Sequence, residues 1–341
     1  MIPHSRPWIT DEDRQAVDRI LGSGMIAQGA QVQAFEEQIA RYVGTPDAIA
    51  VGSGTAALVL ALKALCAEPD DEVILPTYVC RSVADAVVQV GLTPVFCDVG
   101  DSWTMTADTV APHVSGKTRA IIVVHLYGIV VETSCLRRFG VPLIEDCCQA
   151  FGGERKEQRV AATGEISVFS FHATKCLATG EGGMATTYSP EIAQRMRAAH
   201  GRKVVTSPMT DLQAALGLAQ LARYPEMLER RRYLAERYLM ELAAHLTQRI
   251  ATQKACTMYF RFPIRMSEGF SFEEVSAEFH QAGVVVRRGV DELLHRRFGI
   301  SDGYYPSARR LFDETVSLPI YPALSDEEQD VIIQVCRRLW G

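Results

Sequence analysis

The segment Ser170–Gly183, SFHATKCLATGEGG, holds a single lysine, Lys175, between an aromatic-rich predicted strand and a glycine-rich turn. A lysine amine in such a position can form a Schiff base with a carbonyl compound. Most lysines are solvated surface charges, so this segment predicts covalent chemistry only if other segments supply the rest of a site. Two segments upstream do so.

The first is Gly52–Leu58, GSGTAAL, which follows a short apolar strand predicted at residues 48–51 and opens an almost wholly apolar helix. Backbone N–H groups and the positive end of the helix then point at one spot, which suits a phosphate group. The alternative is an ordinary strand-to-helix turn in which Thr55 caps the helix.

The second is Ile144–Gln149, IEDCCQ, in which an apolar strand delivers Asp146 at its carboxyl end. A carboxylate there can keep a pyridine nitrogen protonated, which makes the ring an electron sink. The alternative is an acid that caps the next element. Together, the lysine, the phosphate spot and the carboxylate predict a site for pyridoxal 5'-phosphate (PLP).

These segments resemble the DegT/DnrJ/EryC1/StrS aminotransferases, the sugar aminotransferases of PLP-dependent fold type I. The resemblance covers most of the chain in collinear order, and SFHxTK and TGEGG are its most specific parts. It also includes SGMIAQGAQVQAFEEQIARYVG, LPTYVCRSVADAVVQVGLTPVFCDV, VVHLYG, DLQAALGLAQL and LPIYPALSDEE.

The resemblance implies a role for each matching residue. Lys175 matches the Schiff-base lysine and Asp146 the partner of the pyridine nitrogen, and the freed lysine amine would also be the nearest base to the substrate Cα. The other implied cofactor-binding residues are Gly54, Thr55 and Ser170 at the phosphate, Gln149 near O3′, Tyr78 stacked on the ring, and His172 near the phosphate or the lysine.

Three of these residues keep an alternative interpretation. Gln149 could satisfy backbone groups, Tyr78 could be a core aromatic residue, and His172 could be a structural histidine.

The resemblance also implies the reaction. Some relatives carry histidine in place of the lysine and are dehydratases, whereas this chain has His172 in addition to Lys175. Transamination is therefore expected: an amino donor, by resemblance L-glutamate, gives its amine to PLP, and a keto acceptor, in the family usually a nucleotide-linked sugar, collects it. The alternatives are an aminotransferase of a non-sugar ketone, a PLP lyase or racemase, and a non-catalytic regulator.

Three departures from the family pattern concern the substrate side. Arg81 stands where a small residue is usual, and it could bind the cofactor phosphate or a substrate anion, or be a solvated first-turn arginine. Arg287 fits the arginine that relatives carry before the sugar-site loop. The segment His200–Asp211 is short and lacks the asparagine that in relatives reaches the partner subunit's phosphate, and residues 256–265 are also compact.

Composition limits the possible partners. The net charge of -6 gives no basic footprint, so nucleic acid is not expected. The nine cysteines show no CxxC pair, which indicates reduced cysteine in the cytoplasm rather than a disulfide framework or a metal site. We expect no signal peptide and no membrane span, and the resemblance implies a homodimer with active sites at the subunit boundary.

Short apolar runs alternate with helical patterns, which is typical of an α/β fold with a mostly parallel sheet between helices. We predict strands at residues 48–51, 72–75, 94–98, 120–125, 142–144, 166–171 and 184–187. A long helix from Leu212 to about Leu246, interrupted near Pro225, would lead from a large PLP-binding domain, residues 1–225, into a small C-terminal α/β domain, residues 226–341. Ligands of such sheets gather at the carboxyl ends of the strands.

Overall fold

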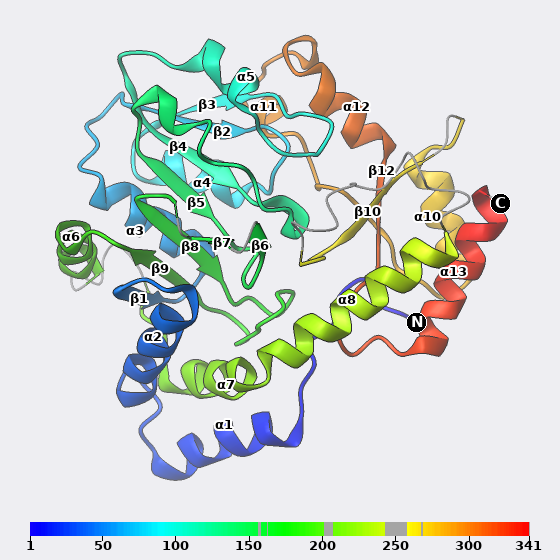
Figure 1. The fold of residues 1–341 in the computed structure, drawn as a ribbon, viewed down its shortest axis with the longest axis horizontal. Helices are drawn as coiled ribbons and strands as arrows, with labels where there is room; N and C mark the ends of the chain where they lie inside the picture. Colours follow the sequence, from blue (N-terminus) through cyan, green and yellow to red (C-terminus); the bar gives the residue numbers. More distant parts are fainter. Residues whose placement is uncertain (156–157, 162, 201–206, 243–257, 267–268, 341) are drawn as a thin grey trace.

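The computed structural model describes residues 1–341 except 156–157, 162, 201–206, 243–257, 267–268 and 341. Its largest sheet has seven strands in the order β1-β9-β8-β5-β4-β2-β3 (Figure 1). The strands are β1 (Asp47–Val51), β2 (Glu72–Pro76), β3 (Thr93–Cys97), β4 (Thr118–Val124), β5 (Leu143–Asp146), β8 (Ile166–Ser170) and β9 (Gly183–Thr187). Only β9 runs antiparallel to its neighbours, so the predicted mostly parallel sheet is confirmed.

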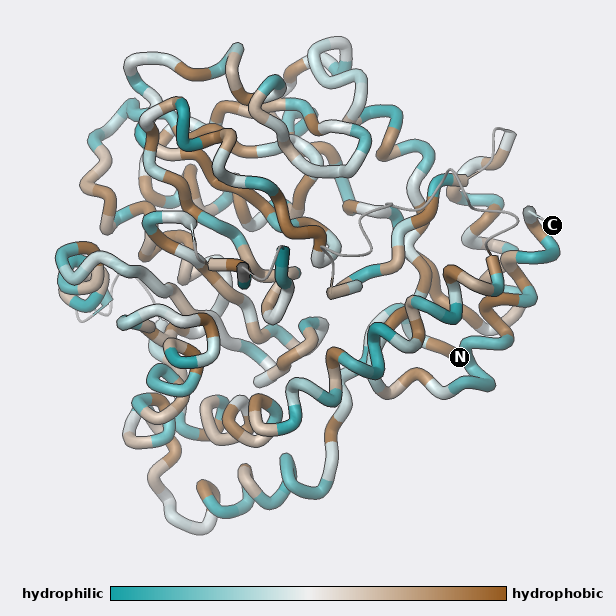
Figure 2. Tube along the Cα trace, in the orientation of Figure 1, coloured by the Kyte–Doolittle hydropathy of each residue, from teal (hydrophilic) through white to brown (hydrophobic). Residues whose placement is uncertain are grey.

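Helices cover both faces of this sheet. A buried core on one face includes α3 (Gly54–Ala64), α4 (Ser82–Gln89) and α6 (Pro190–His200). A second core on the other face includes α2 (Ala30–Val43) and α7 (Asp211–Ala222), and α1 (Asp11–Ser23) packs on α7. Figure 2 shows hydrophobic residues along the central strands and mostly hydrophilic ones along α1. The continuous apolar character of the strands follows from their burial on both faces.

A smaller unit follows in the sequence. Its antiparallel sheet has the order β10-β12-β11, with β10 (Phe262–Arg265), β12 (Thr315–Leu318) and β11 (Arg287–Arg288). The helices α8 (Tyr224–Glu241), α10 (Phe272–Gln281) and α13 (Asp326–Trp340) share one buried core with it. The remaining elements are α5 (Ala107–Val110), α11 (Leu294–Arg297), α12 (Pro306–Glu314), the hairpin β6 (Glu154–Arg155) and β7 (Gln158–Arg159), and short 3-10 turns at Ala111–His113, Leu126–Gly128, Arg137–Phe139 and Asp302–Tyr304.

The predicted long helix is two helices, α7 and α8, and Pro225 lies in the first turn of α8, where a missing N–H is tolerated. The last predicted residues, 243–246, lie outside the described residues. The N-terminal residue Ile2 packs on the smaller unit. Ile2 donates its N–H to Gly283 O at 2.7 Å and is buried in the core of the smaller unit, because its apolar side chain finds cover there. The boundary at residue 225 stays a prediction.

Among the described residues, no helix is both long and apolar enough to cross a membrane.

Candidate active site

The register of β9 brings two predicted segments together. Gly183, the first residue of β9, pairs with Val51 at the end of β1 and with Ser170 at the end of β8. A Cβ added to Gly183 would lie 2.2 Å from the carbonyl oxygen of Ser53. Only glycine lets the chain pass this close, so the glycine-rich turn after Lys175 holds the start of α3 beside Ser170.

The start of α3 forms a small cradle next to Ser170. A Cβ added to Gly54 would lie 2.8 Å from Ser170 Cβ and 3.2 Å from Ser170 Oγ. Ser53, not Thr55, caps the helix, since its Oγ accepts the Ala56 N–H at 3.1 Å. The alternative in which Thr55 caps α3 is therefore wrong. The Thr55 hydroxyl makes no hydrogen bond within the described part of the chain. The first N–H groups of the helix remain available to an anion.

Asp146 is the last residue of β5 and is only 3% exposed. Its Oδ1 accepts the Cys148 N–H at 3.0 Å, and its carbonyl oxygen accepts the N–H of His125 at 3.1 Å. The carboxylate is thus fixed at the carboxyl edge of the sheet, which is where the sequence predicts it.

Lys175 lies half-buried in the loop between β8 and β9. Its backbone N–H donates to His172 O at 2.8 Å, and its Nζ lies 5.1 Å from the centre of the Phe260 ring. Phe260 comes from the smaller unit, just before β10. The sequence analysis did not single it out, because nothing in its local pattern tells which distant loop it meets.

Two cysteines lie within range of the charges of both Lys175 and Asp146. Burial raises the pKa of the Cys80 thiol, the charge of Asp146 raises it further, and Lys175 opposes both. The pKa of Cys148 is raised by the same burial and the same carboxylate, and Lys175 again opposes the change. Cys80 is exposed to solvent, and Cys148 is half-buried. The sequence analysis missed both cysteines as site residues.

The Tyr78 side chain does not reach Lys175 or Asp146. It is 1% exposed in the core, where its hydroxyl accepts a hydrogen bond from Tyr127 at 3.1 Å. Burial raises its pKa to about 12. This position corresponds to the core-aromatic alternative, because a ring enclosed by protein has no free face for a cofactor. Cys80, two residues later, is exposed to solvent.

Gln149 and His172 hold local backbone. Gln149 Oε1 accepts the N–H of Tyr127 at 2.9 Å, and within the described residues its amide nitrogen makes no hydrogen bond. His172 Nδ1 accepts the Thr174 N–H at 3.2 Å, and its Nε2 lies 3.7 Å from the Glu181 carboxylate. Both side chains thus make the contacts of their structural alternatives, while Gln149 keeps two N–H donors for a ligand.

The two predicted substrate arginines are exposed. The Arg81 side chain is 69% exposed and pairs with Asp85 at 3.3 Å, one turn along α4, which supplies the compensating anion for a cation at a helix start. Arg287 lies in β11 on the smaller unit. Residues 201–206 of the segment His200–Asp211, and residues 256–257 of the compact region at 256–265, lie outside the described residues.

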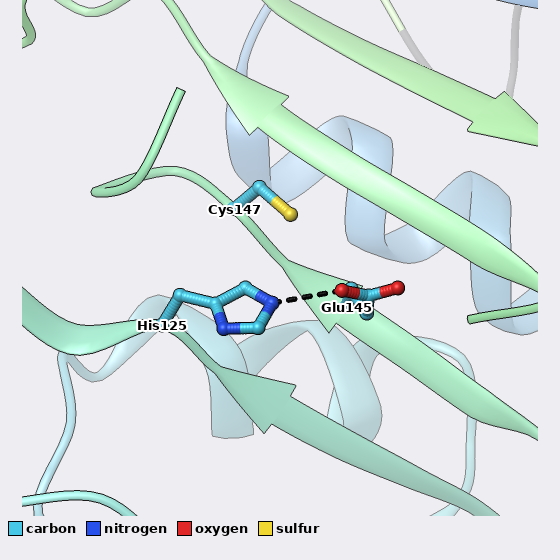
Figure 3. A group of neighbouring side chains, drawn as sticks. All are labelled: His125, Glu145 and Cys147. Atoms are coloured by element: carbon cyan, nitrogen blue, oxygen red, sulfur yellow. Dashed lines mark hydrogen bonds and ion pairs between the residues drawn. The ribbon is translucent and has the colours of Figure 1, made fainter. Parts of the chain in front are cut away.

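A buried group that the sequence analysis did not assign lies behind Asp146: His125, Glu145 and Cys147, whose possible ligand atoms are within 4.8 Å of one another (Figure 3). His125 Nδ1 accepts the Val131 N–H at 3.0 Å, so its proton is on Nε2, which donates to Glu145 Oε2 at 2.9 Å. Both ring nitrogens are therefore already used.

The rest of this group is equally committed to hydrogen bonds. Glu145 Oε1 accepts the N–H and Oγ1–H of Thr163, at 3.0 and 2.8 Å, and the N–H of Gly164. Burial raises the pKa of the Cys147 thiol well above its ordinary value, so it stays protonated. Protein hydrogen bonds account for all three side chains, and we interpret the group as structural. Its sequence signal was a histidine and an acid at the ends of two adjacent strands, in VVHLYG and IEDCCQ.

Comparison with known proteins agrees with this geometry. The model of the DegT/DnrJ/EryC1/StrS aminotransferase family matches residues 7–337. The chain is 33% identical to the spore coat polysaccharide biosynthesis protein SpsC of Bacillus subtilis, over 98% of this chain and 96% of that protein. It is 29% identical to GDP-perosamine synthase of Vibrio cholerae, over 96% of each.

Among solved structures, the PLP form of the putative sugar aminotransferase Spr1654 of Streptococcus pneumoniae superposes with a TM-score of 0.91, at 29% identity over 100% of both chains. The chain belongs to the DegT/DnrJ/EryC1/StrS aminotransferase family, whose members are PLP-dependent enzymes of fold type I.

Proposed function

We propose that this protein transfers an amino group from L-glutamate to the keto group of a nucleotide-linked sugar. The observation that carries the proposal is that Asp146 ends β5 and Ser170 ends the adjacent β8, beside the start of α3, with Lys175 in the loop that follows β8. The names of the relatives support the acceptor class, since one is a GDP-perosamine synthase and another a putative sugar aminotransferase.

The residues present fit PLP. A phosphate needs several donors, and the start of α3 offers backbone N–H groups beside the Ser170 hydroxyl, because Gly54 lets the two segments pack closely. A pyridine nitrogen needs a fixed carboxylate, and Asp146 is held through both its side chain and its carbonyl oxygen. The amide donors of Gln149 suit a ring oxygen.

Bound PLP supplies an electron sink for the pair released when the substrate Cα–H bond breaks. The Lys175 amine takes that proton and returns it to the carbon that ends the half-reaction. Asp146 holds a proton on the ring nitrogen. Phe260, whose ring lies 5.1 Å from Lys175 Nζ, keeps water away from one side of the amine. The acceptor then uses the same residues in the opposite order.

The test is to incubate the purified protein and PLP with L-glutamate and measure 2-oxoglutarate, first alone and then with keto acceptors. Stoichiometric 2-oxoglutarate without acceptor, and turnover with a nucleotide-linked keto-sugar, are expected. Turnover only with small keto acids would move the acceptor to the non-sugar class. Product without 2-oxoglutarate would indicate a lyase, and no reaction at all would indicate a regulator. Lys175→Ala is the control that should abolish both half-reactions.

We further propose that two copies of this chain form the working enzyme. Three large apolar side chains at and after the end of α1 are exposed, namely Leu21 at 58%, Met25 at 74% and Ile26 at 48%. A second copy would cover such a surface. Light scattering at micromolar concentration should give a dimer mass, and Met25→Glu should shift the protein toward monomer.

A further inference from the structure

Arg231 is a buried charged side chain in α8, the helix that runs from α7 into the smaller unit (Figure 1). Only 2% of it is exposed, and no carboxylate among the described residues lies within ion-pair distance of its guanidinium. Its Nε is also buried and makes no hydrogen bond within the described part of the chain. Burying a charge in this way is unfavourable, so we expect the contacts that it does make to have a role.

Those contacts are with three backbone carbonyl groups. Arg231 Nη1 donates to the carbonyl oxygens listed here with their distances: Tyr259 at 2.8 Å, Phe260 at 3.1 Å and Ile320 at 3.1 Å. The first two belong to the segment just before β10, and this segment brings the Phe260 ring to 5.1 Å from Lys175 Nζ. Arg231 is thus hydrogen-bonded to the residue whose ring contacts the amine.

The same segment has a strained backbone. Tyr259 has a φ angle of 52°, in the left-handed region that an aromatic residue rarely adopts, so its surroundings must hold it there. Toward the large unit, backbone N–H groups of the segment donate to Gly128 O at 3.2 Å and to Tyr127 O at 3.4 Å. The 2.8 Å hydrogen bond from Arg231 is shorter than both, and it holds the strained residue itself.

We propose that Arg231 is a positioning residue, which holds the Phe260 ring against the Lys175 amine. It does so by fixing the carbonyl groups of Tyr259 and Phe260. The proposal rests on the proposed function, in which Lys175 is the reacting amine. A guanidinium suits this role because its planar group donates in fixed directions. Without it, we expect Tyr259 to leave its strained conformation and the ring to move away from the amine.

The test measures how fast acetic anhydride acylates Lys175 in the PLP-free protein, by mass spectrometry of peptides, with the exposed Lys117 as internal reference. Arg231→Met should raise the relative rate at Lys175 roughly fivefold or more, the factor by which losing one or two buried hydrogen bonds shifts a local equilibrium. Arg231→Lys keeps the charge, so it separates position from electrostatics. It should also raise the rate, because an ammonium group lacks the fixed donor directions of the guanidinium.

Arg230→Met is the matched control. Arg230 is the preceding residue, and it donates to Leu324 O at 2.7 Å and to Asp326 at 2.8 Å instead of to the Phe260 segment. This variant should therefore acylate Lys175 at the wild-type rate.

A double variant tests whether Arg231 acts through the ring. Adding Arg231→Met to Phe260→Leu should change the rate at Lys175 little beyond the effect of Phe260→Leu alone, because the ring that Arg231 positions is already absent.

The proposal is overturned by an unchanged Lys175 rate in Arg231→Met, or by effects of Arg231→Met and Phe260→Leu that add in the double variant. An equal rise in Arg230→Met would indicate general loosening of α8 and would also overturn it. If Arg231→Met does not fold, Arg231→Lys decides, and a wild-type rate at Lys175 in that variant overturns the proposal. The assay needs neither cofactor nor turnover, so a protein that gives the expected rates but aminates no sugar contradicts only the proposed function.

Discussion

Replacing Glu145 by glutamine tests the buried hydrogen-bond group behind Asp146. The carboxylate accepts three hydrogen bonds on Oε1 and one from His125 on Oε2. Glutamine has one acceptor oxygen and one NH2 group, so in either orientation its NH2 group faces a donor. His125 cannot adapt by moving its proton to Nδ1, because that nitrogen accepts the Val131 N–H.

The expected cost follows from these contacts. Leaving a buried donor unpaired costs about 1 to 3 kcal/mol, and the cost is larger where the lost partner is charged. We expect Glu145→Gln to lower the free energy of unfolding of the apoprotein by about 3 kcal/mol, measured by urea titration. Glu165→Gln is the matched control, because Glu165 accepts a single N–H, from Leu143 at 2.6 Å, and its loss should cost about 1 kcal/mol.

The pH dependence provides a second measurement. Burial alone would raise the pKa of Glu145, but the hydrogen bond from His125, with the donors at Gly164 and Thr163, holds it below its ordinary value. A carboxyl with a depressed pKa in the folded state stabilises the protein above its unfolded pKa, and this contribution is lost as pH falls toward the folded value. The difference in free energy of unfolding between wild type and Glu145→Gln should therefore be constant above about pH 5 and shrink below about pH 4.5.

The reasoning would be refuted if Glu145→Gln and Glu165→Gln lowered the free energy of unfolding equally. It would also be refuted if the difference between wild type and Glu145→Gln did not shrink in acid.

Three further changes test the site. Asp146→Asn should still bind PLP but lose more than about tenfold in turnover, because a neutral amide cannot keep the ring nitrogen protonated; turnover closer to wild type would remove Asp146 from that role. Gly54→Ala should weaken PLP affinity at least roughly tenfold, by equilibrium dialysis, because its methyl would meet Ser170 at 2.8 Å, and unchanged affinity would locate the phosphate elsewhere. Tyr78→Ala should cost about 3 to 5 kcal/mol of stability, as for other buried aromatic residues, whereas PLP loss in a protein of normal stability would restore the stacking interpretation.

The sheet and its carboxyl edge could be predicted from the sequence because both depend on local patterns. Short apolar runs between turn residues gave all seven strands, within a few residues. Once the strands are parallel, their carboxyl ends meet, so Asp146, Ser170 and Lys175 had to lie close together. The glycines also indicate this region, because the backbone at Gly183 passes close to the carbonyl oxygen of Ser53.

The walls of the cleft could not be predicted in this way. Tyr78 and Cys80 both follow β2 closely, and the bend after the strand decides which of them faces the core. Phe260 reaches Lys175 from the smaller unit, and no local pattern encodes that contact. Ile2 is a similar case, because it pairs with Val284 near the other end of the chain.

This difference separates the chemistry of the site from its specificity. His125 holds two successive residues of β5, donating from its backbone to Asp146 and from its ring to Glu145, so the carboxylate proposed to bind the cofactor is anchored to a buried network. Lys175 is fixed by the glycine turn at the same edge. The candidates for substrate recognition, Arg81 and Arg287, come from a helix start and a two-residue strand outside this network. Changes at these positions can therefore alter the substrate while the parallel sheet keeps the reacting groups in place.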